Sequence, residues 1–340
     1  VEVGRPPAHA QCEAGVLRED RDLTKAGVGL RLRKHAFFLP DRLDARRLRT
    51  WVERERPDAI VTTLPNDHRI ALRAAGSVPV VRLLFADGQE DPRPRELASL
   101  RAAPRIFVFA DAPQRRLAGL GIAEDRLVRI DPPLDVQRLR ADVRDPRAFR
   151  EELGVPADTC LFGIVARLQR HRRYEMLRDA LAALKSRGRA FHVAVLGRGT
   201  YQQEVGKDPV ARLGLDDVVT FAGYRRGEAY ASAVAAFDAQ IFLVPGSDPT
   251  CRALREGLAL GAAGLTTRRG LLPALVEDGR SGWLVDETQE AFTDAMARMA
   301  ADLPATRRMG AEAARLAGER FDAARVAETV ITAIGDVVSA

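Results

Sequence analysis

The chain has 340 residues, of which 46% are hydrophobic and 29% are charged. A chain of this size and apolarity can bury about two domain cores, which excludes a disordered tail and a disulfide-stabilised miniprotein. Cys12, Cys160 and Cys251 are too few and too scattered for a disulfide framework or a zinc cluster. No apolar run approaches the ~18–20 residues that a membrane span needs. We therefore expect an enzyme of a reducing, cytoplasmic compartment.

The charge is unevenly distributed along the chain. The formal net charge is +6, but residues 1–150 hold 29 basic and 22 acidic residues, whereas the remainder holds 24 and 25. Only four of the basic residues are lysines, so the arginine excess first indicates a compositional bias and gives little support to nucleic-acid binding. The basic first half is either a solvated surface or one that meets an anionic partner, such as a phosphorylated glycan or a lipid headgroup.

The first half alternates short apolar runs with amphipathic stretches, a pattern typical of parallel α/β layers. Strands are expected at 1–4, 35–39, 58–64, 78–85, 105–110 and 125–130. Helices are expected at 45–56, 67–75, 94–102 and 113–120. The charged segment up to about residue 150 reads as a linker loop.

A second α/β series follows this linker. Its strands are expected at 160–167, 191–197, 218–223, 239–246, 262–267 and 282–285, and a last helix at 322–338. This order predicts two Rossmann-like domains facing a cleft, at 1–150 and 151–320, followed by a C-terminal helix at 321–340. Ligands of open parallel sheets bind outside the carboxyl ends of the strands, so the strand-to-helix loops are the place for a site.

The most informative segment is VPGSDPTCRALREGLALG, residues 244–261. Asp248 followed by proline predicts a helix cap with proline at the first helical position, and Gly261 is a fitting C-terminal glycine. The N–H groups of Thr250 and Cys251 would then face an anion such as a phosphate. From these residues alone, Asp248 is equally explained as a plain helix cap and Glu256 as a surface carboxylate.

This segment resembles the signature of retaining nucleotide-sugar glycosyltransferases of the GT-B fold, family 4, also called glycosyl transferases group 1. In that family two carboxylates flank seven residues, and here Asp248 stands in place of the usual first glutamate. The resemblance implies that Glu256 binds both ribose hydroxyls of the nucleotide and that Asp248 binds hydroxyls of the donor sugar. It also implies that Thr250 and Cys251 offer backbone N–H groups to the sugar or the diphosphate.

A second segment, residues 163–181, resembles the family's glycine-arginine stretch. Arg167 stands at the family's arginine position and Arg172 at its lysine position, and the match places Gly163 among the donor-binding residues. The two arginines would stabilise the diphosphate as negative charge develops on it, although a solvated arginine-rich loop is the alternative. No D-x-D motif ends a strand, so neither a metal nor a cofactor is expected.

The resemblance extends over residues 159–316 in the family's order. It places Tyr224 beside the nucleotide base, with interdomain packing as the alternative. In the first half it is weaker: Asn66 or Asp67 would cap a helix, and His68 would either face the acceptor hydroxyl or be a structural histidine. We also expect the first half to lack the family's first βα unit, roughly 30–35 residues.

The resemblance implies transfer of a sugar, with retention of anomeric configuration, from a nucleotide sugar to a glycan or lipid-linked acceptor. The basic first half would allow peripheral contact with the inner face of the membrane. Three alternatives stay open from the sequence: a nucleotide-sugar epimerase, a nucleotide-binding scaffold that catalyses nothing, and a nucleic-acid binder.

Overall fold

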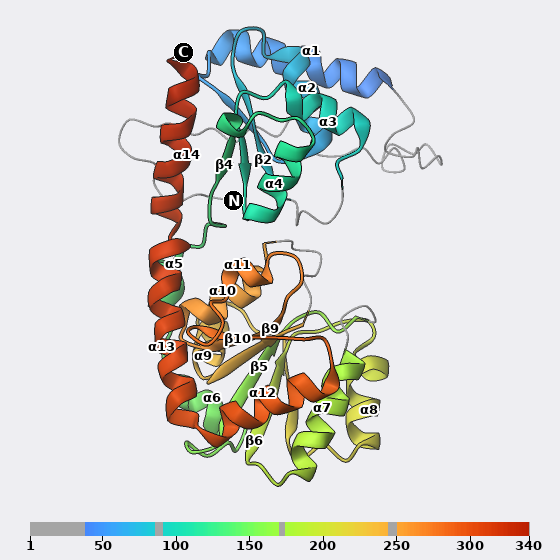
Figure 1. The fold of residues 1–340 in the computed structure, drawn as a ribbon, viewed down its shortest axis with the longest axis vertical. Helices are drawn as coiled ribbons and strands as arrows, with labels where there is room; N and C mark the ends of the chain where they lie inside the picture. Colours follow the sequence, from blue (N-terminus) through green and yellow to red (C-terminus); the bar gives the residue numbers. More distant parts are fainter. Residues whose placement is uncertain (1–37, 86–90, 170–173, 244–249, 340) are drawn as a thin grey trace. The chain divides into compact units, whose positions relative to one another are not determined.

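The computed structural model describes residues 38–85, 91–169, 174–243 and 250–339. They form two compact units (Figure 1). One contains the described residues up to Ile130 together with those from Ala327 onward, and the other contains Asp131–Val326. The expected fold class, α/β with two Rossmann-like domains, is confirmed.

The first unit is built on a four-stranded parallel sheet whose strands follow one another in chain order. Its strands are β1 (Ile60–Thr62), β2 (Val80–Leu84), β3 (Ile106–Val108) and β4 (Leu127–Arg129). Its helices are α1 (Phe38–Glu55), α2 (Pro65–Ala74), α3 (Pro94–Arg101), α4 (Asp111–Gly119) and the 3-10 turn η2 (Glu124–Arg126). The strands and helices expected between residues 45 and 130 are confirmed: the strands are shorter than expected, and three of the four helices begin earlier.

The strand expected at 35–39 is wrong where the structure describes it, because residues 38 and 39 begin α1. An apolar run of five residues cannot by its period distinguish a strand from a helix. The Pro-Asp pair that follows it suits a first helical turn, where proline costs no hydrogen bond and an acid favours the dipole. The strand expected at 1–4 lies outside the described residues.

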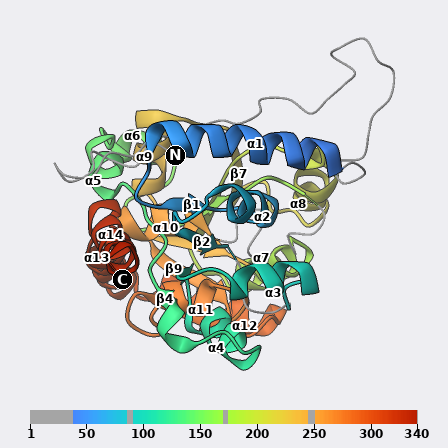
Figure 2. The same ribbon diagram turned by 90° about the horizontal axis from the view of Figure 1, so that it is seen from above.

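The core of the first unit joins the two helices α1 and α2 to the sheet. Leu48 and Val52 of α1 pack with Ile70 and Ala71 of α2 and with Val80 of β2. Figure 2 shows α1 lying beside α2. A second cluster places the apolar side of α3 and α4 against β2, β3 and β4. Both helix pairs therefore fix the strand ends from which the loops of this unit emerge.

The second unit contains a six-stranded parallel sheet in the order β10-β9-β8-β5-β6-β7. Its strands are β5 (Cys160–Val165), β6 (Phe191–Leu196), β7 (Val219–Gly223), β8 (Ala239–Phe242), β9 (Ala263–Thr267) and β10 (Gly282–Val285). These confirm the six expected strands. Chain order reverses between β5 and β8, the arrangement of a doubly wound nucleotide-binding sheet.

Helices cover both faces of this sheet. Apolar residues of α7 (Tyr174–Ser186) and α12 (Gln289–Ala301) pack on one face, and those of α6 (Pro146–Glu152) and α9 (Gly227–Ala235) pack on the other. The remaining helices are η4 (Gln203–Lys207), α8 (Asp208–Arg212), α10 (Arg252–Ala259), α11 (Leu272–Leu275) and α13 (Leu303–Arg320). Of these, α13 packs against α10 and β9.

The segment expected to be a linker loop contains two helices, α5 (Val136–Ala141) and α6. Their caps are Asp135 and Asp145, whose carboxylates accept from backbone N–H groups in the first turn of each helix. Arg140 donates to the carbonyl oxygens of Ala259 and Ala314, so this segment packs on the second unit. The boundary therefore falls at residue 130, about twenty residues before the position expected from composition.

The two ends of the second unit are joined to each other. Leu134 donates its N–H to the carbonyl oxygen of Phe321 at 2.7 Å, and Ala323 donates to the carbonyl oxygen of Leu134 at 3.0 Å. Arg320 pairs with Asp131 at 2.7 Å. The last helix, α14 (Ala323–Val338), confirms the one expected at 322–338. No helix in the described ranges combines the length and apolarity that crossing a bilayer requires.

Candidate nucleotide-sugar site

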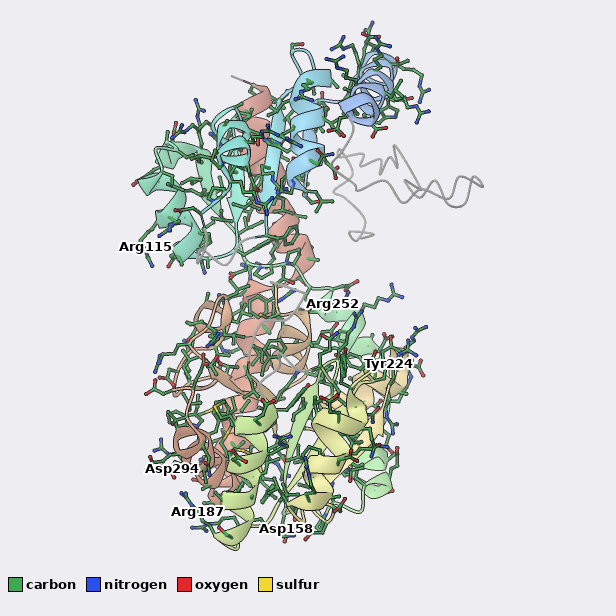
Figure 3. All side chains as sticks on the ribbon, turned by 90° about the vertical axis from the view of Figure 1, so that its right-hand side faces the viewer. Arg115, Asp158, Arg187, Tyr224, Arg252 and Asp294 are labelled. Atoms are coloured by element: carbon green, nitrogen blue, oxygen red, sulfur yellow. The ribbon has the colours of Figure 1, made fainter. Side chains whose placement is uncertain are left out.

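The strand order of the second unit predicts where a ligand binds. Strands β5 and β8 are adjacent but belong to opposite halves of the sheet, and in open parallel sheets the carboxyl ends of such a strand pair, the switch point, are where ligands bind. The loops after these two strands carry the two sequence segments singled out above. Figure 3 shows Arg252 and Tyr224 toward one end of this unit and Asp158, which precedes β5, at the other end.

Helix α10 begins later than the sequence predicts. It starts at Arg252, and Cys251 holds the capping position in the left-handed conformation, with φ 51°. A left-handed residue interrupts the helical backbone, so a start at residues 248–249 is wrong. Asp248 itself lies outside the described residues. The expected C-terminal glycine is confirmed, because Gly261 follows the last turn with φ 96°.

Glu256 is a buried carboxylate and not a surface group of the helix. Its exposed fraction is 7%, and each of its oxygens has a partner. The hydroxyl of Tyr230 donates to Oε2 at 2.5 Å, and Nε of Arg252 donates to Oε1 at 2.8 Å. Burial and the neighbouring Glu256 charge raise the pKa of Tyr230 well above its ordinary value, so the phenol stays protonated as a donor.

Arg255 holds the loop that precedes α10. Its guanidinium is 2% exposed and donates to Thr250 twice, to the carbonyl oxygen at 2.8 Å and to Oγ1 at 2.9 Å. It also donates to the carbonyl oxygens of Pro132 and Pro133, both at 2.9 Å. The planar fork thus fixes the backbone of Thr250, one of the residues expected to present an N–H to the donor.

Arg167 is exposed at the carboxyl end of β5. Glycines of the β6 loop let backbone pass close to it: a Cβ at Gly197 would lie 2.0 Å from the carbonyl oxygen of Ala166, and one at Gly199 would lie 2.3 Å from that of Leu168. The loop carrying Arg167 is therefore supported by its neighbour. Arg172 lies outside the described residues.

Tyr224 follows β7 and is 53% exposed. The guanidinium carbons of Arg198 and Arg226 lie 4.7 and 5.0 Å from its ring centroid, and Nε of Arg226 donates to its hydroxyl at 3.1 Å. A guanidinium over an aromatic ring is attracted to its face, so these contacts stabilise the position of the Tyr224 ring. The ring is thus held at the same edge of the sheet as Arg167 and Glu256, and its contact with a base stays a prediction.

Comparison with known proteins supports this geometry. A family model described as glycosyl transferases group 1 matches residues 145–316, half of the chain. The chain belongs to this family. The matched region is nearly the whole of the second unit, so the family signature and the switch point between β5 and β8 lie in the same unit.

Two curated relatives illustrate the similarity. The D-inositol 3-phosphate glycosyltransferase of Saccharomonospora viridis is 29% identical over 264 residues, covering 74% of this chain and 60% of the relative. The putative colanic acid biosynthesis glycosyltransferase WcaL of Escherichia coli is 32% identical over 194 residues, covering 55% and 45%. The aligned part thus spans about half of each of these relatives.

Solved structures share the fold of this group 1 chain. Anabaena Alr3699/HepE, crystallised with UDP, superposes with a TM-score of 0.71 at 19% identity, covering 86% of this chain and 82% of that one. A glycosyltransferase from Rickettsia africae gives a TM-score of 0.75 at 13% identity, covering 93% and 86%.

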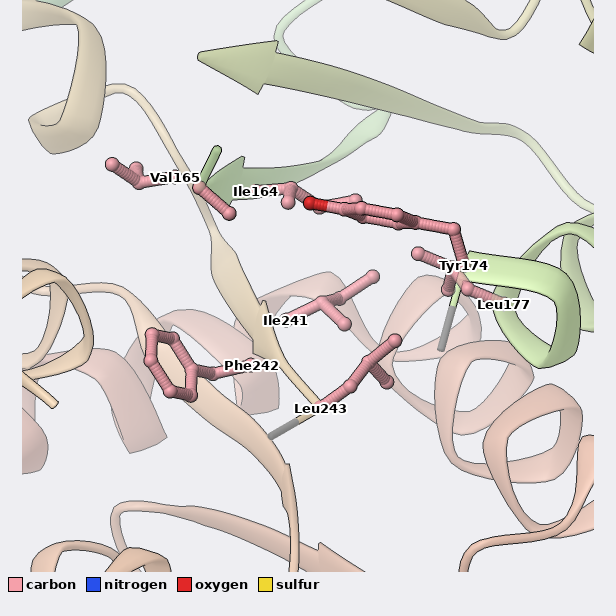
Figure 4. Close-up of a pocket in the computed structure, with 8 residues that line it drawn as sticks. Ile164, Val165, Tyr174, Leu177, Ile241, Phe242 and Leu243 are labelled. Atoms are coloured by element: carbon pink, nitrogen blue, oxygen red, sulfur yellow. The ribbon is translucent and has the colours of Figure 1, made fainter. Parts of the chain in front are cut away.

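Gly163 lies in the middle of β5, away from the loops. A Cβ there would stand 2.0 Å from the ring of Phe237, so the glycine makes room for a core side chain. Toward the end of the same strand, residues of β5, β8 and α7 enclose a small apolar cavity of about 20 Å³ (Figure 4). This volume suits about one water molecule and is far too small for a nucleotide.

His68 lies inside the first unit with an exposed fraction of 0%. Its Nε2 is 3.2 Å from the carbonyl oxygen of Ser99, and its Nδ1 is 2.8 Å from Oγ1 of Thr62. A carbonyl only accepts, so Nε2 of the neutral ring carries the proton and Nδ1 is an acceptor. The Thr62 hydroxyl has one hydrogen to share between this Nδ1 and the carbonyl oxygen of Val81, 3.1 Å away. Burial lowers the pKa of His68 to about 4. The geometry supports the structural alternative, in which the imidazole joins β1, α2 and α3.

The expected cap of this helix is wrong. Helix α2 begins at Pro65 with Leu64 in the capping position, so neither Asn66 nor Asp67 caps it. Proline at the first turn fixes the start without a side-chain cap.

The site also contains residues that the sequence analysis missed, Tyr230 and Arg255 foremost among them. The ion pair of Arg252 with Glu256 could have been predicted, because the two residues stand four positions apart on one helix. Within the described ranges, no three His, Cys, Asp or Glu side chains gather as a metal site would require. Chemistry without a metal stays a prediction.

Proposed function

We propose that this protein is a glycosyltransferase that moves a sugar from a nucleotide sugar to a hydroxyl acceptor. The observation that carries the proposal is the buried Glu256 carboxylate, which lies on the helix that follows the switch-point strand β8 in a group 1 domain. A carboxylate presents acceptors to two hydroxyls at once, which suits the ribose of a nucleotide. The UDP bound to the structurally similar HepE supports a nucleoside diphosphate as the ligand class.

In this proposal the exposed Arg167, with Arg172, binds the diphosphate and stabilises the charge that develops on it as the sugar departs. Asp248 binds the donor sugar, while Thr250 and Cys251 present N–H groups to it. Two guanidinium groups supply the positive charge that a metal would otherwise provide, so we propose that the reaction needs no metal. Retention of configuration follows from the family resemblance and belongs to the same proposal.

For the acceptor we propose an anionic glycan or lipid-linked saccharide. The support is the basic first half and the exposed arginines of α1, which include Arg42, Arg46, Arg47 and Arg49. Co-sedimentation with vesicles of phosphatidylglycerol, but not of phosphatidylcholine, is the expected result if peripheral membrane contact presents the acceptor. Equal sedimentation with both would reject the electrostatic contact.

A thermal-shift panel of UDP, GDP, ADP and their sugar conjugates identifies the donor, because a bound ligand stabilises by RT ln(1 + [L]/Kd). Product analysis by NMR with a saccharide acceptor then reports transfer and anomeric configuration. An epimerised nucleotide sugar without free nucleotide would instead identify an epimerase. Binding without turnover of any acceptor or of the donor would identify a nucleotide-binding scaffold.

Replacing the ribose-binding carboxylate tests the site itself. Glu256→Gln should weaken nucleotide binding about 10–100-fold, because a charge-assisted hydrogen bond is lost. The matched control is Glu290→Gln, which makes the same change on an exposed position of α12 and should leave the Kd unchanged. Equal Kd values for the two variants would show that Glu256 does not bind the nucleotide.

A further inference from the structure

The two partners of Glu256 differ in how firmly they hold it. Tyr230 lies on α9, half-buried, and its hydroxyl reaches Oε2 at 2.5 Å. The side chain of Arg252 is 69% exposed, against 10% for that of Glu256. An exposed ion pair contributes about 0–1 kcal/mol because water and salt compete with it. The phenol, on a short and stiff side chain, is the stronger constraint on the carboxylate.

Tyr230 donates to one oxygen of the Glu256 carboxylate and leaves that oxygen able to accept a second hydrogen bond. A carboxylate oxygen has two lone pairs, so Oε2 can accept from Tyr230 and from a ligand hydroxyl together. Burial and the Glu256 charge raise the pKa of Tyr230, so the hydroxyl stays a donor at neutral pH. The carboxylate plane is therefore held in one orientation before a ligand arrives, which reduces the entropy lost on binding.

We propose that Tyr230 is a positioning residue of the nucleotide site: it orients the Glu256 carboxylate so that both ribose hydroxyls can be bound at once. The proposal rests on the proposed function, in which Glu256 binds ribose. Arg252 donates to Oε1 from a side chain that is mostly exposed, so it constrains the orientation of the carboxylate less than Tyr230 does. The residue that sets the preference for a ribonucleotide therefore lies on α9, twenty-six positions from the carboxylate that it serves.

The test compares the Kd of UDP with that of 2′-deoxy-UDP by calorimetry on the full chain, or the guanosine pair if the panel identifies GDP. The wild-type protein should prefer the ribonucleotide by about tenfold, the effect of one hydrogen bond to a charged group. Tyr230→Phe keeps the ring and removes the hydroxyl. It should weaken UDP binding several-fold and 2′-deoxy-UDP binding little, so the preference falls to about twofold.

A purely structural tyrosine gives a different result. If Tyr230→Phe weakens both nucleotides equally and the preference stays near tenfold, the proposal is wrong. Tyr201→Phe is the control for loss of a phenol hydroxyl and should keep the preference. Arg252→Gln removes the exposed partner of Oε1 and should lower the preference less than Tyr230→Phe does. Loss of the preference in Arg252→Gln alone would assign the positioning role to the arginine and overturn the proposal.

Different measurements would reject the proposed function and the role of Tyr230. If wild-type protein binds no nucleoside diphosphate at all, the site assignment fails before any ratio is measured. If it binds UDP with the expected preference and Tyr230→Phe does not alter that preference, only the role of Tyr230 is rejected. Melting temperatures of all variants, measured without ligand, confirm that each is folded at the titration temperature.

Discussion

The sheet of the second unit has a buried carboxylate at each end, and the two have different surroundings. Asp238 lies just before β8, where it accepts from the N–H of Leu161 at 2.8 Å, from Arg150 at 3.1 Å and from Arg307 at 2.8 Å. Glu256 lies on α10, the helix that follows the same strand, with a phenol and an exposed arginine as partners.

The difference separates a structural carboxylate from the one that we propose binds the nucleotide. Arg150 also donates to the carbonyl oxygens of Pro156, Thr159 and Ala236, so the Asp238 cluster ties three segments together at the amino end. Burial, with the Asp238 charge, raises the pKa of the adjacent Cys160 thiol, which is therefore unreactive. At the carboxyl end the partners of Glu256 leave lone pairs for a ligand.

The largest expected effect comes from Asp238→Ala. Removing this carboxylate leaves the buried Arg150 guanidinium uncompensated, which should cost about 3–5 kcal/mol of unfolding free energy. Urea unfolding followed by the fluorescence of Trp283 on β10 measures it. Under conditions where the variant is folded, its Kd for the nucleotide should match the wild type. A cost below about 1 kcal/mol, or a selective loss of nucleotide binding, would break the distinction between the two ends.

His68 provides a second test of a buried titratable group that serves the fold. Above pH 6.5 it is neutral in both the folded and the unfolded chain. Below that pH the unfolded chain takes up a proton that the folded chain refuses until about pH 4, so stability falls as pH falls, by up to about 3 kcal/mol. Trp51 on α1, which packs on α2, reports this in a Trp283→Phe background. His68→Gln should remove this part of the pH dependence, and an unchanged slope would contradict the assignment.

Gly163, in the middle of the sheet, tests whether a residue between the two carboxylates serves the packing of the core. Gly163→Ala places a Cβ against the Phe237 ring and should cost about 1–3 kcal/mol, with part recovered in Gly163→Ala/Phe237→Leu. Gly335→Ala, which meets open space in α14, is the control and should be neutral or slightly stabilising. Weakened nucleotide binding at unchanged stability would instead support the donor-binding role that the family resemblance gives this glycine.

Apolar runs predicted the strands well because each strand of a parallel sheet is buried on both faces. The first residues of helices were harder to predict from the sequence. The same Asp-Pro pair occurs at 145–146, where it begins α6, and at 248–249, after which α10 begins only at Arg252. The pair alone does not say which of them continues as a helix, because the left-handed backbone at Cys251 depends on the packing around it.

The residues of the candidate site also differ in whether the sequence could predict them. Glu256 could be found because its spacing is a signature of a family. Tyr230 could not, because its contact joins α9 to α10 across 26 positions and exists only once β8 has placed the two helices together. Arg255 contacts carbonyl oxygens more than 120 positions away, and any of 49 arginines in the sequence could have done so.

The hydrogen bonds between Leu134 and residues 321 and 323 have a topological consequence. They hold the entering and the leaving segments of the second unit, Asp131–Val326, side by side. Such a stretch can be joined end to end by a short linker and reopened at a surface loop without stretching any strand. The second unit is in this sense a self-closed module, whose sequence order can be permuted while its sheet stays the same.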